Sequence, residues 1–229
     1  METFLIVGAS GDIGSAILKK ILAMENTVIA TYNTKKIEII NKNLEKIQCN
    51  VLEHNFDAII NDKINHIVYC VGESCYENLY NASYESFCIQ CDLQVYAPLE
   101  IIRMALQKKS NIKTITFIAS EAGINPSLNS SFYGLAKGMM INMAKVLAKD
   151  LIIKGIRVNV IAPGLTYSSM ANRLCEKRNI TIQEEEERRI DRKLVNPDEI
   201  AELCYLLTTH VFRHINGQVI RINSEKNKF

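Results

Sequence analysis

The stretch from residue 4 to residue 22 constrains the fold of this chain most. Residues 4–7 (Phe-Leu-Ile-Val) form a short, wholly apolar run, which predicts a strand buried on both faces of a parallel sheet. A glycine-rich turn follows at residues 8–14, and apolar side chains then recur at helical spacing over residues 17–22. Strand, glycine turn and helix in this order are the context of a phosphate-binding turn, because a helix N-terminus attracts anions.

The three glycines of this turn have the spacing GxxGxxG, which departs from the simplest dinucleotide fingerprint, GxGxxG. An ordinary glycine-rich turn is the alternative interpretation, so the flanking strand and helix carry the prediction. Glycine permits a tight turn and a close approach of the backbone to a pyrophosphate. The predicted phosphate-binding residues are Gly8, Ser10, Gly11, Asp12, Ile13 and Gly14.

Apolar runs with strand character alternate with helical patterns along the chain. Further strands are predicted at residues 27–32, 47–51, 66–71, 114–118, 156–161 and 217–222, and helical patterns at 37–44, 56–60, 83–106 and 197–201. Pro98 is expected to kink or divide the helix at 83–106. This alternation indicates an α/β fold: a single doubly wound parallel sheet of about seven strands, Rossmann-type, with helices on both faces. Residues 1–229 should form one domain, with the polar segment 165–195 as a substrate lid.

Composition is that of an ordinary globular protein, with 48% hydrophobic residues, 23% charged residues and a net charge of +2. The chain lacks a basic block with interleaved aromatic residues, so nucleic acid is not an expected partner. It also lacks a long apolar stretch and a basic leader, so neither membrane insertion nor secretion is expected. Seven scattered cysteines favour reduced thiols and a cytoplasmic location. Cys88 and Cys91 form a CxxC without a second pair, and no metal site is predicted.

The end of the second predicted strand bears on the choice of dinucleotide. NAD-preferring sites usually place Asp or Glu here to bind the ribose 2′-hydroxyl, whereas this chain has Asn33, Lys35 and Lys36 and no acid. A lysine attracts a 2′-phosphate, so we predict NADPH over NAD, with Asn33 and Lys35 among the contacts. The alternative is that Lys35 and Lys36 only begin a solvated helix.

Further loops should meet at the edge that carries the glycine turn, because the carboxyl ends of parallel strands lie together. Asn50 and Val51 end the third predicted strand and are candidates for the adenine edge. Gly72 ends the fourth, where backbone can lie against a cofactor. Ser120 and the pair Pro163-Gly164 follow the strands at 114–118 and 156–161.

A hydroxyl, a phenol and an ammonium group are predicted to converge at this edge. Ser120 ends a buried strand, Tyr133 follows it by thirteen residues, and Lys137 follows the tyrosine by four. If Tyr133 opens a helix, its side chain and that of Lys137 lie on one face. A nearby cation favours the phenolate and lowers a phenol pKa that is ordinarily about 10. Such a set can polarise and protonate a carbonyl oxygen, although Tyr133 and Lys137 could equally be an ordinary aromatic residue and a surface lysine.

In combination, these residues resemble the short-chain dehydrogenase/reductase family over nearly the whole chain. The matching elements are the turn at 8–14, Ser120, Tyr133 with Lys137, Arg157-Val158-Asn159, Pro163-Gly164 and Asn216-Gly217-Gln218. Within the family, the chain is similar to the 3-oxoacyl-carrier-protein reductase group. Residues 30–34 and 132–138 resemble a branch that includes bacterial elongation-factor-P 5-aminopentanone reductases.

The resemblance implies roles for the matching residues. Tyr133 would protonate the carbonyl oxygen, Lys137 would bind the nicotinamide ribose and lower the phenol pKa, and Ser120 would polarise the carbonyl. The residues implied to face the nicotinamide are Pro163, Gly164 and Thr166.

The chain departs from the family pattern at two places. The family's Asn-Asn-Ala-Gly is here Tyr-Cys-Val-Gly at residues 69–72. The family's fourth catalytic residue, an asparagine, has no obvious counterpart. Matching the motif at residues 92–98 puts Gln94 there, whereas counting back from Ser120 without a gap puts Asp92 there.

The leading hypothesis is an NADPH-dependent reductase of a ketone or a 3-oxoacyl thioester, acting on a small-molecule or acyl-carrier-bound substrate as a homodimer or homotetramer. One alternative is a nucleotide-binding regulatory protein that has lost turnover, and another is an NAD-dependent alcohol dehydrogenase. The segment 165–195 does not distinguish between substrates, and its charge run at 183–189 is expected to form a solvated helix face.

Overall fold

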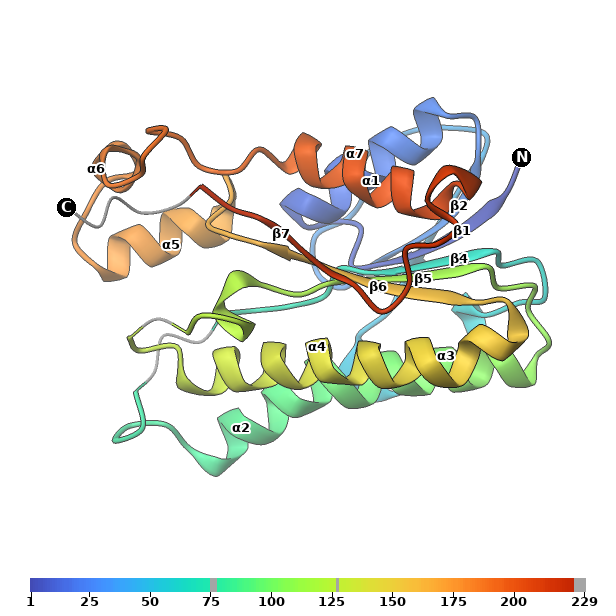
Figure 1. The fold of residues 1–229 in the computed structure, drawn as a ribbon, viewed down its shortest axis with the longest axis horizontal. Helices are drawn as coiled ribbons and strands as arrows, with labels where there is room; N and C mark the ends of the chain where they lie inside the picture. The colour runs from blue at the N-terminus through green and yellow to red at the C-terminus, as the bar shows by residue number, and fades with distance from the viewer. Residues whose placement is uncertain (75–77, 127, 225–229) are drawn as a thin grey trace.

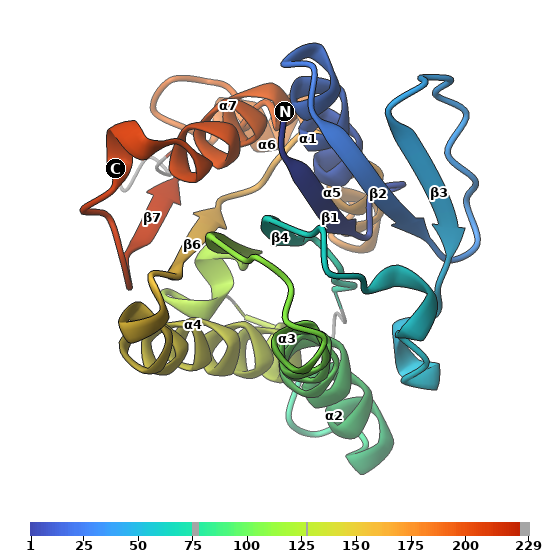
Figure 2. The same ribbon diagram turned by 90° about the vertical axis from the view of Figure 1, so that its right-hand side faces the viewer.

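The computed structural model describes residues 1–74, 78–126 and 128–224. Seven strands form one sheet in the order β3-β2-β1-β4-β5-β6-β7, and all neighbouring strands are parallel. Helices α1 and α7 cover one face of the sheet, and α2, α3 and α4 cover the other (Figures 1 and 2). This confirms the predicted doubly wound sheet. The strand order reverses between β1 and β4, and ligands bind at such switch points.

The element boundaries are as follows. The strands are β1 Thr3–Val7, β2 Thr27–Tyr32, β3 Leu44–Gln48, β4 His66–Tyr69, β5 Thr114–Ile118, β6 Arg157–Pro163 and β7 Val219–Ile222. The helices are α1 Asp12–Ala23, α2 Tyr84–Cys91, α3 Ala97–Gln107, α4 Ser131–Leu151, α5 Ser169–Lys177, α6 Ile182–Glu187 and α7 Pro197–Thr208.

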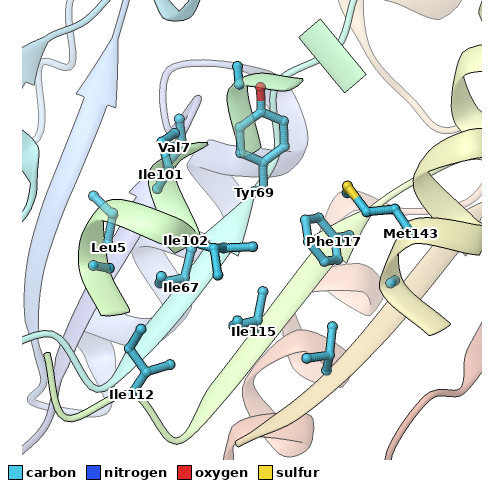
Figure 3. Packing of buried hydrophobic residues seen from close by; sticks show 14 of the residues in the cluster. Leu5, Val7, Ile67, Tyr69, Ile101, Ile102, Ile112, Ile115, Phe117 and Met143 are labelled. Atoms are coloured by element: carbon cyan, nitrogen blue, oxygen red, sulfur yellow. The ribbon is translucent and has the colours of Figure 1, made fainter. Parts of the chain in front are cut away.

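Two apolar layers hold the helices to the sheet. Figure 3 shows the layer in which Ile67, Ile115 and Phe117 of the sheet pack against Ile102 of α3 and Met143 of α4. The second layer joins α1 and α7 to the other face. Full burial of one such large side chain contributes roughly 1.5–3 kcal/mol. The carboxyl ends of the strands are therefore held on a rigid frame.

The predicted helix at 37–44 is wrong. Residues 37–43 lie in an irregular connection, and β3 begins at Leu44, three residues before the predicted strand at Ile47. The Asn41 side chain accepts a hydrogen bond from the Asn43 backbone N–H at 2.9 Å, which stabilises a turn. Ile40 is 95% exposed, so the isoleucines of this segment do not form one buried helix face.

The predicted helix at 83–106 is divided, as expected at Pro98. Ser83 caps α2 by accepting a hydrogen bond from the Ser86 N–H, and α2 ends at Cys91. A π-helical turn spans Asp92–Tyr96, and α3 then begins with Pro98 in its first turn, where no backbone donor is required. The π turn inserts an additional residue and changes which side chains face the sheet.

The segment 165–195 leaves the sheet after β6 and contains α5 and α6, which lie beyond the carboxyl ends of β6 and β7 (Figure 1). Its two ends are joined, because the Val195 N–H donates to the Leu165 carbonyl at 3.0 Å and Thr166 pairs with Val195. Its role as a lid stays a prediction. The expected solvated face at 183–189 is wrong in part, because Glu185 is fully buried among arginines. None of the described helices is long and apolar enough to span a membrane.

Candidate active site

Ser120 and Tyr133 line one cavity of about 590 Å³ at the carboxyl edge of the sheet. Ser120 follows β5, and its hydroxyl accepts a hydrogen bond from the Ala122 N–H at 3.1 Å. The loop after Ser120 lies directly on α4, since a Cβ on Gly123 would come within 2.7 Å of the Lys137 carbonyl carbon. Glycine at this position therefore allows the serine and the tyrosine to share the cavity.

Lys137 lies one helical turn after Tyr133, with its Nζ 5.9 Å from the centre of the phenol ring. The lysine is 3% exposed and donates a hydrogen bond to the Ile118 carbonyl oxygen at 2.9 Å. Burial lowers the pKa of Lys137 to about 7, and the nearby Cys70 thiol opposes this effect. The predicted pairing of phenol and ammonium on one helix face is therefore present, with a cation that titrates near neutrality.

Gln94, and not Asp92, lies beside this lysine. A Cβ on Gly72 would come within 3.1 Å of the Lys137 Nζ and 3.2 Å of the Gln94 Nε2, so both side chains flank this glycine. Gln94 is fully buried on the π turn, and neither amide atom has a hydrogen-bond partner among the described residues. Asp92 instead lies 2.8 Å from the His54 Nε2. Two unpaired buried amide atoms are costly, which indicates a position that serves a ligand or water.

The glycine turn has the geometry that a pyrophosphate requires. Gly8 has a φ of +86°, and its N–H donates to the Thr31 hydroxyl at 3.0 Å. A Cβ on Gly14 would lie 2.2 Å from the Gly8 carbonyl oxygen, so only glycine lets α1 start this close to β1. The α1 N-terminus follows this turn directly, and the first backbone N–H groups of a helix attract anions. These residues fit a dinucleotide.

Asp12 has a partner outside the turn. Its carboxylate accepts hydrogen bonds from the backbone N–H and the hydroxyl of Ser169, at 2.9 and 2.8 Å. Ser169 is the first residue of α5, so Asp12 joins the glycine turn to the segment 165–195. Ile13, the next residue, lines the cavity that contains Ser120 and Tyr133.

The predicted contacts for the adenosine half lie at the ends of β2 and β3. Asn33 and Lys35 are exposed, and Lys35 is therefore accessible to a phosphate. The Asn50 side chain accepts from the Leu52 N–H at 3.2 Å and donates to Glu53 at 3.0 Å, so its amide is occupied locally. Val51 is 5% exposed and packs in the core, which leaves its backbone as the group that could face a base.

The residues expected at the nicotinamide follow β6. Pro163, Gly164 and Thr166 all line the cavity. A Cβ on Gly164 would overlap the Asn223 side chain at 1.9 Å, and the Thr166 hydroxyl donates to the Gly164 carbonyl at 3.0 Å. The loop is thus fixed from both sides next to Ser120 and Tyr133.

Three arginines that sequence reasoning missed also line this cavity: Arg178, Arg189 and Arg221. Two of them come from the segment 165–195 and one from β7. A partial signal was present, because Glu185 and Arg189 have the i, i+4 spacing of a helical ion pair. The burial of that pair could not be read from the spacing.

The parallel sheet, its switch point and the glycine turn define an α/β protein that binds a dinucleotide beside a Ser-Tyr-Lys set. A family model described as enoyl-(acyl carrier protein) reductase matches residues 8–224. The uncharacterized oxidoreductase YmfI of Bacillus subtilis is 28% identical, and the alignment covers 97% of both chains. The 3-oxoacyl-(acyl-carrier-protein) reductase FabG of Rickettsia bellii is 27% identical over 97% of this chain and 95% of the relative.

Among solved structures, a short chain dehydrogenase family protein from Francisella tularensis superposes with a TM-score of 0.86, at 26% identity over 97% of both chains. The chain therefore belongs to the short-chain dehydrogenase/reductase family, and it resembles the 3-oxoacyl-carrier-protein reductases. It is an NAD(P)-dependent oxidoreductase.

Proposed function

We propose that the chain is an NADPH-dependent carbonyl reductase that acts on a ketone or a 3-oxoacyl thioester. The observation that carries the proposal is the placement of Tyr133 and Lys137 on one face of α4, with Ser120 and Tyr133 lining the same cavity. The similarity to the 3-oxoacyl-(acyl-carrier-protein) reductase of Rickettsia bellii supports a 3-oxoacyl substrate. The bound nicotinamide would supply the hydride.

The three side chains would divide the work on the carbonyl oxygen. Ser120 would donate a hydrogen bond that holds and polarises the oxygen, and Tyr133 would transfer a proton to it. Lys137 in its charged form would lower the phenol pKa and hold the cofactor ribose. Because burial brings the pKa of Lys137 to about 7, this support is strongest at and below neutral pH.

Gln94 is the proposed fourth member of the set. Its amide can both donate and accept, and it lies across Gly72 from the Lys137 ammonium. A water held between the Gln94 amide and the Lys137 ammonium would give Lys137 a route to take up a proton from solvent after Tyr133 has protonated the substrate. The engagement of Asp92 with His54 favours Gln94 over Asp92 for this role.

The test follows NADPH absorbance with a panel of ketones and 3-oxoacyl thioesters. Tyr133→Phe should lower kcat by about 10²- to 10⁴-fold while NADPH binding is retained, because it removes the proton donor and keeps the ring. Tyr84→Phe is the matched control, since Tyr84 is 82% exposed on α2. Equal turnover in wild type and Tyr133→Phe would refute the assignment.

The NADPH preference is proposed from Asn33 and Lys35 at the end of β2. Lys35→Asp should weaken NADPH binding by about 10- to 100-fold relative to NADH, because a charge-assisted contact contributes roughly 1.5–3 kcal/mol. Lys36→Asp at the neighbouring exposed position is the control. An unaltered NADPH preference in Lys35→Asp would contradict the role of Lys35.

A homodimer or homotetramer is proposed from an exposed apolar face of α4. Leu135 and Val146 are 56% and 51% exposed and lie eleven residues apart, which places them on the same side of the helix. Light scattering after size exclusion, with Leu135→Glu and Val146→Glu together, tests it. Assembly that is unchanged in the double variant would exclude this face.

A further inference from the structure

The cavity that contains Ser120 and Tyr133 carries an excess of positive charge. Arg178, Arg189 and Arg221 line it, and the described lining residues include a single carboxylate, that of Glu121. Glu121 lies next to Ser120, and Arg221 binds it in a bidentate pair, with both N···O distances at 2.8 Å. This pair neutralises itself, which leaves Arg178 and Arg189 to set the charge of the cavity.

Arg178 and Arg189 share one buried carboxylate with a third arginine. Glu185 is fully buried, and its oxygens lie 2.7 Å from Arg189, 3.6 Å from Arg188 and 4.0 Å from Arg178. One buried carboxylate thus contacts three guanidinium groups, and the carboxylates of Asp191 and Glu184 also interact with Arg189 and Arg188. Arg178 makes the longest of these contacts, and its side chain is 22% exposed.

Arg189 has one buried nitrogen that the described residues do not satisfy. Its side chain is 7% exposed, and two of its nitrogens bind the Ser224 carbonyl at 2.8 Å and Glu185 at 2.7 Å. The third nitrogen, Nε, is buried and has no hydrogen-bond partner among the described residues. A buried guanidinium donor without an acceptor is costly, but its burial keeps it out of direct contact with a ligand in the open cavity. Arg178, at 22% exposure, is the arginine of this cluster that such a ligand can reach.

The position of Arg178 separates it from the phosphate-binding turn. Ser169, at the start of α5, contacts Asp12 of the turn. Arg178 follows the end of this helix, and nine helical residues span about 13 Å. Arg178 is therefore about one helix length away from the contact with the turn, while it lines the same cavity as Ser120.

We propose that the substrate is a carbonyl compound with a carboxylate of its own, which Arg178 binds as a bidentate partner. This inference rests on the proposed reductase function, and it names the substrate class of that same site. A planar guanidinium matches a carboxylate in shape and charge, whereas a neutral ester offers Arg178 only an uncharged acceptor.

The experiment compares a series of oxo acids with their methyl esters. In the series the carboxylate lies one to five carbons from the ketone, and a neutral 3-oxoacyl N-acetylcysteamine thioester is added as a third arm. Wild type should reduce the best oxo acid with a kcat/KM about 10- to 100-fold above that of its ester. Arg178→Gln should abolish this ratio by lowering kcat/KM for the acid to about the value for its ester.

Arg188→Gln is the matched control, because Arg188 also contacts Glu185 but does not line the cavity. It should keep the full preference for the acid, which separates loss of the binding group from disturbance of the Glu185 cluster. Arg178→Lys should keep part of the preference, since it retains the charge without the planar fork.

A binding measurement separates this inference from the proposed reaction. The dissociation constants of acid and ester are measured by calorimetry with Tyr133→Phe in the presence of NADPH, where no turnover is needed. Acid and ester that bind equally, or an acid preference that survives Arg178→Gln, would overturn the inference. If the protein reduces the esters and the thioester as well as the acids, the inference about the carboxylate is also overturned. The proposed reductase function would be retained in that case.

Discussion

Lys137 and Glu185 are both buried charged residues, but their surroundings differ. Lys137 is 3% exposed, and within the described residues its Nζ donates to a backbone carbonyl and faces no carboxylate. Glu185 is fully buried against three arginines. Burial without a counter-charge brings the pKa of Lys137 to about 7, whereas the arginines compensate the charge of Glu185.

The difference shows how one fold uses buried charge for two purposes. An uncompensated cation next to a phenol can gain or lose a proton near neutral pH, as a proton-transfer site requires. A compensated carboxylate instead fixes the arrangement of its partners. Here it holds Arg189 and Arg178 at the wall of the cavity, on a segment whose ends are joined at Leu165 and Val195.

The largest expected effect concerns the pH dependence of stability in Lys137→Met. The pKa of Lys137 is 10.5 in the unfolded chain and about 7 in the folded one, so the unfolded chain binds more protons between these values. The free energy of unfolding of wild type therefore rises with pH over this range, by up to about 5 kcal/mol. Lys137→Met should lack this rise and be more stable than wild type near pH 6.5. Urea unfolding at pH 6.5, 8 and 9.5 tests this prediction. It would be contradicted if the free energy of unfolding rose with pH equally in both proteins.

Glu185→Gln should do the reverse and destabilise the protein. Removal of one partner from a buried ion pair costs about 3–5 kcal/mol, because the arginines keep their charge without a counter-charge. For a chain of this length, that corresponds to a Tm lower by roughly 10 °C. Glu187→Gln, exposed on the same helix, is the control and should stay within about 0.5 kcal/mol of wild type. A Glu185→Gln protein as stable as wild type would show that the Glu185 carboxylate does not stabilise the surrounding arginines.

Gln94→Leu tests the surroundings of Lys137, because the Gln94 amide lies beside the lysine. The variant removes two buried amide atoms that have no partner among the described residues, so it should stabilise the protein by about 1–3 kcal/mol. Its turnover should fall by about tenfold if the amide serves Lys137. Thermal unfolding and NADPH oxidation are measured on the same preparation. A destabilised variant would mean that the amide is already satisfied.

The smallest effect is expected at the cap of α6. Thr181 and Glu184 form a capping box at the start of α6, the helix that carries Glu185. Thr181→Ala should cost about 1 kcal/mol, well below the cost of Glu185→Gln. Thermal unfolding distinguishes the two. An equal loss would mean that helix formation, and not the ion cluster, holds this part of the cavity.

Much of the fold could be predicted because its signals are local. The apolar runs at β1, β2 and β5 and the helical pattern at 197–201 gave elements close to those in the structure. The segment 37–44 failed because its apolar spacing imitates a helix, while Asn41 and Asn43 stabilise a turn. The spacing of hydrophobic residues does not reveal that a turn competes with the helix at this segment.

The site was predictable where it depends on spacing along one element, as for Tyr133 and Lys137. The choice between Gln94 and Asp92 was not, because a π turn changes the facing of side chains without a sequence signal that we could recognise. The arginine wall was beyond reach for another reason. Arg178, Arg189 and Arg221 come from three separate elements, and only the folded chain brings them to one cavity.

The pH profile of NADPH-dependent reduction tests the central claim, that Lys137 supports proton transfer from Tyr133, most directly. The value of kcat/KM for NADPH reports the ionisations of the free protein, so it should decline above about pH 7 in wild type, as Lys137 loses its proton. Lys137→Met should retain a small residual rate without a decline in this range. A wild-type profile that stays level to pH 9, or one that Lys137→Met shares, would contradict the claim.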